Sequence, residues 1–166
     1  MQFSTQVVFP ASAGAVAEMF ATEEYVREKI AASGATGGTV EVVPSPDGAV
    51  TITSRRNMPT TDIPATYRSL VGSSLEVHEV DAWEAPAPDG ARRGTISLDV
   101  SGAPVRVTGT LELEATSDAQ SVLRIAGDIK ASVPFFGKAI ERALADSVER
   151  AADVERQVGL RWLAQH

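Results

Sequence analysis

The sequence contains no cysteine and two histidines, His78 and His166. Without cysteine the chain cannot form a disulfide scaffold, a zinc–thiolate site, an iron–sulfur cluster or a thiol nucleophile. Two histidines are too few for a histidine-rich metal site, and a serine–histidine–aspartate set would depend entirely on His78. No serine stands in a Gly-x-Ser-x-Gly pattern. We therefore expect no metal site, no cofactor and no catalytic residue, and we interpret His78 as a surface residue.

Positive charge is also scarce, with 15 Lys and Arg against 22 Asp and Glu and a net charge of −7. The longest basic runs are the pairs Arg55-Arg56 and Arg92-Arg93. Nucleic acids and anionic membrane surfaces are bound through basic patches, so neither is an expected partner. The sequence also lacks an apolar run of about 18 residues and an N-terminal signal-peptide pattern. We expect a cytoplasmic protein without stable membrane insertion.

What the chain does contain is typical of one globular domain. Its 166 residues are 43% hydrophobic and 22% charged, and they include no internal repeat or long linker. Two short segments rich in proline, aspartate and glycine, 44–48 and 86–90, lie between β-rich runs and indicate hairpin loops. We predict a single domain over residues 1–166.

The spacing of apolar residues predicts the secondary structure. Alternation at every second position predicts strands at residues 2–9, 39–43, 49–57, 74–84, 93–100, 105–115 and 121–131. Ser12 is expected to cap a short helix that includes Phe20, and Thr22 a second helix through Ile30. After Pro134 the spacing becomes helical to about Ala164.

The terminal helix is the longest predicted element, about 45 Å at 1.5 Å per residue. It carries one apolar stripe, so it needs one large surface to lie on. We expect its small residues Ala139, Ala143, Ser147 and Ala151 to face the sheet and leave room there. The order β-α-α-β-β-β-β-β-β-α thus predicts an α+β helix-grip fold, in which a curved seven-stranded antiparallel sheet wraps around the long C-terminal helix.

This element order, and the entry Val133-Pro-Phe-Phe-Gly137 into the terminal helix, resemble the START-like, birch-pollen-allergen-like helix-grip superfamily (SRPBCC), which includes polyketide cyclases, dehydratases and lipid-transfer proteins. The stretch from Lys130 to Lys138 and the ending Glu155…Trp162-Leu163 look more narrowly like an actinobacterial family of unknown function, DUF2505. The resemblance covers the whole chain, and its motifs are architectural. It implies a hydrophobic cavity for lipid-like, isoprenoid or polyketide-like molecules.

Candidate ligand-binding residues follow from side-chain alternation on the strands and from the helix stripe. The same positions would also suit an ordinary packed core, which remains the alternative. The candidates are Arg56, Met58, Tyr67, Leu75, Val77, Trp83, Leu98, Val107, Phe135, Ile140, Leu144 and Val148.

Two predicted strands carry charge on the face that otherwise points inward. Strict alternation would bring Arg56 to the same interior region as Glu79 and Asp81. Such a cluster could anchor a polar group of a ligand or act as an acid–base pair, because buried charges must be paired. The alternative, which we favour, is a bulge near Glu79 that turns Val80 and Ala82 inward and both acids outward.

The segment 56–68 is predicted to be irregular, since it contains Pro59 and Pro64. It also carries Met58 and Tyr67, which a loop would not normally expose. It therefore lies against the rim of the sheet or forms a lid over the cavity mouth, with Tyr67 and Met58 touching what enters.

Three functions remain open. The first is non-catalytic binding or carrying of a hydrophobic small molecule. The second is a cyclase- or dehydratase-type enzyme in the same pocket that uses Arg56, Glu79, Asp81 or Tyr67 for proton transfer, which a raised carboxylate pKa would favour. The third is an interaction module with a filled interior. The sequence identifies no protein partner.

Overall fold

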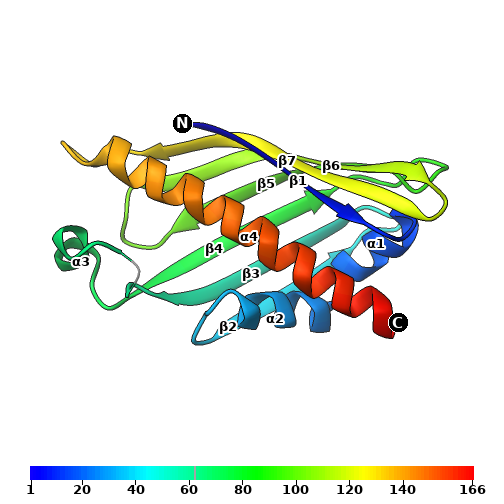
Figure 1. Cartoon of the computed structure of the whole chain (residues 1–166), viewed down its shortest axis with the longest axis horizontal. Helices are drawn as coiled ribbons and strands as arrows, with labels where there is room; N and C mark the ends of the chain where they lie inside the picture. Colours follow the sequence, from blue (N-terminus) through cyan, green and yellow to red (C-terminus); the bar gives the residue numbers. More distant parts are fainter. Residues whose placement is uncertain (62) are drawn as a thin grey trace.

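The computed structural model describes residues 1–61 and 63–166, without the side chain of Leu70. Within this part of the chain, seven strands form one antiparallel sheet in the order β1-β7-β6-β5-β4-β3-β2 (Figure 1). The first strand therefore pairs with the last, and β2 lies at the other edge. The strands are β1 (Gln2–Phe9), β2 (Gly38–Pro44), β3 (Val50–Pro59), β4 (Ser74–Trp83), β5 (Arg92–Val100), β6 (Val105–Ser117) and β7 (Gln120–Ala131).

The described helices lie on one side of this sheet or at its end, and the longest crosses it diagonally (Figure 1). They are α1 (Ala13–Phe20), α2 (Glu23–Ala32), α3 (Ala65–Val71) and α4 (Gly137–Gln165). The predicted helix-grip architecture is confirmed, with strand ends close to those expected from alternation.

Local chemistry explains the turns and one of the two predicted caps. Asp47 and Asp89 each accept a hydrogen bond from the backbone N–H two residues later, which closes the two predicted hairpin loops. The Ser12 hydroxyl accepts from Ala15 N at 3.2 Å and caps α1. Thr22 stands at the predicted N-cap position of α2, but its hydroxyl makes no capping hydrogen bond and donates instead to the Glu18 carbonyl at 2.9 Å.

The segment 56–68 is more regular than its prolines suggested. β3 continues through Met58 to Pro59, and Pro64 stands immediately before α3. Proline is compatible with a strand end and with the start of a helix, because neither position needs its missing N–H. Both prolines therefore mark element boundaries.

The helix α4 packs closely only along its C-terminal half. Its backbone approaches mainly β1, β7 and α2, and its buried residues are Glu155, Val158 and Gly159. The expectation that small residues face the sheet is wrong for Ala139, Ala143 and Ala151, which are exposed, whereas Ser147 is half-buried. The sheet side of the N-terminal half of α4 instead carries larger side chains, Ile140, Leu144 and Val148, each half-buried.

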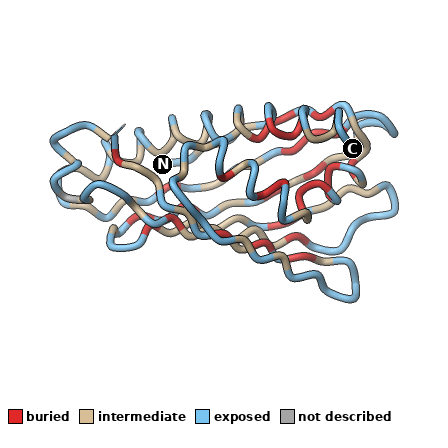
Figure 2. Tube along the Cα trace, turned by 90° about the horizontal axis from the view of Figure 1, so that it is seen from below, coloured by how far each residue is buried: buried red, intermediate tan, exposed pale blue. Residues whose placement is uncertain are grey.

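The apolar core is divided into two clusters. The first, at the end closed by α1, α2 and the last turns of α4, includes Phe9, Tyr25, Trp83 and Val158. Figure 2 shows that the buried part of α4 lies toward the C-terminus, at this end. The second cluster lies near the start of α4, and its buried members are Val77, Val100 and Val105. The second cluster thus has far fewer buried residues than the first.

Candidate functional site

Charged side chains lie on the helix-covered face of β3 and β4. The two strands pair regularly from Val50–Trp83 to Pro59–Ser74, with Ser54 opposite Glu79. The favoured bulge near Glu79 is therefore wrong, and the alternative with strict alternation is right. Glu79 and Asp81 share the face that carries Val77, as Arg56 does on β3.

Arg56 and Glu79 form an ion pair across these strands. Arg56 Nη2 donates to Glu79 Oε2 at 2.7 Å, and the two side chains are 17% and 15% exposed. Arg56 Nη1 also donates to the hydroxyl of the buried Ser54 at 3.4 Å. The positive charge of Arg56 lowers the pKa of Glu79 against the opposing effect of burial. Because the two charges pair with each other, both side chains can point inward on regular strands, and no bulge is needed.

A second ion pair comes from the helices that cover the same region. Lys29 on α2 donates to Glu155 Oε2 on α4 at 2.8 Å, with side-chain exposures of 23% and 10%. The hydroxyl of the buried Tyr25 donates to the other oxygen of Glu155. Burial, and then the nearby charge of Glu155, raise the pKa of Tyr25. The tyrosine therefore stays protonated and serves as a hydrogen-bond donor.

The sequence analysis did not identify Tyr25, Lys29 or Glu155 as site residues. A signal was nevertheless present. Glu155 stands seven positions after Val148 and seven before Trp162, so it lies on the apolar stripe of the helix. Lys29 follows Tyr25 by four positions, on the face that α2 buries. A charged residue within an apolar face indicates a partner across the interface.

Asp81 is the carboxylate without a cation of its own. It is half-buried, its Oδ1 is enclosed, and among the described residues no group donates a hydrogen bond to it. Burial, and then the nearby negative charge of Glu79, raise the pKa of Asp81 to about 8. The carboxyl group is therefore mostly protonated at neutral pH. We call Lys29, Arg56, Glu79, Asp81 and Glu155 the charged cluster.

Half-buried apolar side chains lie around the second core cluster. Those packed against its buried valines include Met58, Leu75, Leu98, Ile140 and Leu144. Five of the predicted ligand-binding residues are therefore brought together with a sixth, Val77. We call this set the open apolar cluster.

Other predicted site residues lie elsewhere. Trp83 stacks on Phe20 in the closed end of the core, with ring centroids 5.9 Å apart, so it does not join the open apolar cluster. Phe135 is fully exposed, at a positive φ of 64°, so it does not join the open apolar cluster. The ring of Phe136 meets Tyr67 of α3 edge to face at 5.3 Å. Val107 is buried in the sheet, and Val148 is half-buried on α4.

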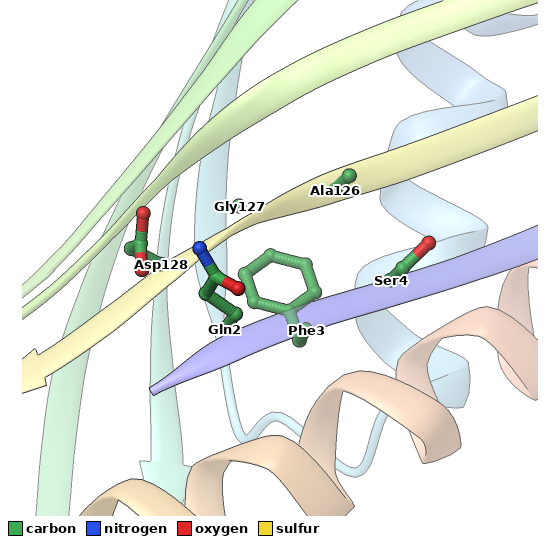
Figure 3. A pocket seen from close by; sticks show the side chains of 6 residues that line it. All are labelled: Gln2, Phe3, Ser4, Ala126, Gly127 and Asp128. Atoms are coloured by element: carbon green, nitrogen blue, oxygen red, sulfur yellow. The ribbon is translucent and has the colours of Figure 1, made fainter.

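Two surface hollows lie away from the charged cluster. Figure 3 shows the first, an open groove of about 550 Å³ over β1 and β7 that is lined by Gln2, Phe3, Ser4, Ala126, Gly127 and Asp128. The second, about 290 Å³, lies between β1 and α4. Phe3 is the one large apolar side chain lining the first, so this groove offers little surface to a hydrophobic molecule. We assign it no function.

Two searches of the part of the chain that the structure describes gave no candidate, one for metal-binding clusters and one for membrane-spanning helices. No three His, Asp or Glu side chains there are grouped to hold a metal ion. None of its helices has both the length and the apolar character needed to cross a membrane.

A family model matches residues 4–163, almost the entire sequence, and it is described as a protein of unknown function (DUF2505). This chain belongs to the DUF2505 family. The narrower resemblance is thereby confirmed. A search of the curated proteins found no match.

Solved structures place DUF2505 within a wider group of similar folds. A START superfamily protein from Mycobacterium smegmatis has a TM-score of 0.61 at 14% identity, over 98% of each chain. The Zhui aromatase/cyclase from Streptomyces sp. R1128 has a TM-score of 0.60 at 13% identity, over 96% of this chain and 91% of its own. Truncated norcoclaurine synthase from Thalictrum flavum has a TM-score of 0.61 at 12% identity, over 100% of this chain and 94% of its own. The START-like helix-grip fold is thus confirmed.

Proposed function

We propose that this DUF2505 protein binds or carries a hydrophobic small molecule, of lipid, isoprenoid or polyketide type, between the sheet and the first half of α4. The observation that supports this most is the uneven burial of α4. Apolar side chains line its sheet side from Ile140 to Val148, yet its fully buried residues begin only at Glu155. A hydrophobic molecule placed between these half-exposed side chains would remove their apolar surface from water, which favours binding.

The charged cluster supports an orientation for that molecule. It lies next to the open apolar cluster on the same face of β3 and β4, where Arg56 is opposite Val77. An apolar tail would contact Met58, Leu98 and Leu144, and a polar end would face Arg56, Glu79 and Asp81. Small-molecule sites usually have mainly apolar walls with a small number of polar groups.

Native mass spectrometry of gently purified protein, followed by solvent extraction, tests the proposal. We expect a bound hydrophobic mass, and we expect the emptied protein to bind the neutral dye Nile red. Leu144→Trp should fill the space and weaken Nile red binding about tenfold or more, since it replaces the contact surface of the dye. Leu160→Trp, at an exposed position of the same helix, is the matched control.

A protein that carries no mass and binds no Nile red would contradict the proposal. It would favour the third hypothesis from the sequence, a filled interior with function at a surface. If Leu144→Trp and Leu160→Trp changed Nile red binding equally, the dye would bind somewhere other than the open apolar cluster.

A second candidate function is an enzyme of cyclase or dehydratase type. Asp81 favours it, because a half-buried carboxyl with a pKa of about 8 can donate or accept a proton near neutral pH. Incubation of the extracted ligand with wild type and Asp81→Asn distinguishes the two functions. A product that only the wild type forms would support catalysis, and an unchanged ligand would support carrying.

Two narrower expectations also remain proposals. The net charge of −7 supports the absence of a nucleic-acid partner, since phosphates would be repelled. The cytoplasmic location expected from the sequence is likewise a proposal.

A further inference from the structure

The charged cluster contains two ion pairs and one further carboxyl group, that of Asp81. Lys29 pairs with Glu155, and Arg56 pairs with Glu79. Asp81 has no such partner, and the charged groups that act on it are these same four. Three acids therefore share two cations.

These charges come from two helices and two strands around Asp81. α2 contributes Lys29, α4 contributes Glu155, and β3 contributes Arg56, while Glu79 precedes Asp81 on β4 itself. The residues directly opposite Asp81 are both apolar, Ile52 on β3 and Ile96 on β5. A ligand carboxylate or phosphate would find both described cations of this site already neutralised and three acids beside it.

We infer that the molecule bound at the open apolar cluster carries a protonated amine at its polar end, and that this amine pairs with the Asp81 carboxylate. The inference rests on the proposed function, since the apolar part of the same molecule would contact the open apolar cluster. An ammonium group supplies the third positive charge that the cluster lacks. It also donates hydrogen bonds, and Asp81 Oδ1 receives none from the described residues.

Proton linkage gives this pairing a measurable signature. In the ligand-free protein, burial and Glu79 raise the pKa of Asp81 to about 8, so below that pH the carboxyl must lose its proton to pair with an amine. An alkyl amine stays protonated to about pH 10. The apparent Kd should therefore fall about tenfold per pH unit from about pH 6 to 8, with release of about one proton on binding.

Decylamine, decanol and decanoic acid, which share one tail, test the inference by titration calorimetry. Buffers of different ionisation enthalpy report the protons released. At pH 8 we expect decylamine to bind the wild type at least about tenfold more tightly than decanol, with decanoic acid weakest. Asp81→Asn should remove this preference and the pH slope while leaving decanol binding unchanged. Asp146→Asn, at an exposed position of α4, is the charge-matched control.

The outcomes separate this inference from the proposal beneath it. If decylamine and decanol bind equally and no proton is released, the inferred amine is wrong, but the proposed binding of a hydrophobic molecule stands. Tightest binding of decanoic acid also overturns it. If none of the three binds, and Nile red does not bind, the proposed function itself is wrong. A cooperative melting curve of Asp81→Asn, with a melting temperature at pH 7 no lower than that of the wild type, excludes misfolding as the cause of lost selectivity.

Discussion

Lys29 and Glu155 are 126 residues apart in the sequence, and their charged groups meet at 2.8 Å. Their ion pair joins α2 to the C-terminal half of α4. Glu155 is also the acceptor for the buried hydroxyl of Tyr25, so one carboxylate satisfies two groups of α2. The position of the C-terminal half of α4 therefore depends on a polar contact as well as on apolar packing.

We predict that Glu155→Leu lowers the free energy of unfolding by about 3 kcal/mol, because it leaves the largely buried Lys29 ammonium without its partner. The double variant Lys29→Met/Glu155→Leu should recover more than half of this loss, since it removes both charges. Urea unfolding measures both, and Glu149→Leu at an exposed position of α4 is the control. A double variant as unstable as the single one would show that the ion pair is not the cause.

Gly159 allows α4 to approach the aromatic core closely. A Cβ at this position would lie 2.5 Å from Phe9 Cε1 and 3.3 Å from Met19 Cε. Alanine is the better helix former by about 1 kcal/mol, but forced overpacking costs about 1 to 3 kcal/mol. We predict that Gly159→Ala destabilises the protein by about 1 kcal/mol in urea unfolding. Phe9→Leu in the same chain should reduce that cost, and strictly additive effects would contradict the steric explanation.

Asp81 predicts a dependence of stability on pH. Its pKa is raised in the folded protein to about 8, so the native state holds a proton that the unfolded state has already lost above about pH 4. The stabilisation from this group is thus complete below about pH 4 and is lost as the pH rises through 8. The slope for one proton is at most about 1.4 kcal/mol per pH unit, and contact of Asp81 with water reduces it.

The measurement is the free energy of unfolding of wild type and Asp81→Asn from pH 5 to 9. We expect the wild type to lose stability relative to the variant as the pH rises, because asparagine does not ionise. The lower limit avoids the opposite effect of Glu79, whose lowered pKa costs stability only in acid. Parallel curves would mean that Asp81 is already ionised at neutral pH in the folded protein.

Alternation along the strands was sufficient to predict the sheet and the inward face of β3 and β4. It was not sufficient to decide whether Glu79 and Asp81 point inward, because Lys29, which balances part of their charge, comes from a helix about 50 residues earlier. The phase of α4 was wrong at Ala139 and Ala143 because small residues fit either side of a helix. The same stripe also included Ile140 and Leu144, and these two do pack against the sheet.

The contact between Tyr67 and Phe136 makes α3 a candidate lid. Their rings meet at 5.3 Å and link α3 to the residue that precedes α4, at the end where the open apolar cluster lies. An edge-to-face aromatic pair contributes about 0.5 to 1.5 kcal/mol, so its loss should favour opening several-fold. We predict that Tyr67→Ala raises the dissociation rate of Nile red about threefold to tenfold in stopped-flow displacement, from that range of energies.

Phe135→Ala provides the matched control, because this neighbouring ring is fully exposed and lies outside the open apolar cluster. Phe136→Ala should reproduce the effect of Tyr67→Ala, and the double variant Tyr67→Ala/Phe136→Ala should add little, since each change removes the same contact. If Tyr67→Ala and Phe135→Ala released the dye at the same rate as the wild type, α3 would be a rim element and the dye would leave by another route. An effect of Tyr67→Ala on dissociation with an unchanged melting temperature would instead mean that the aromatic pair controls access rather than holding the fold together.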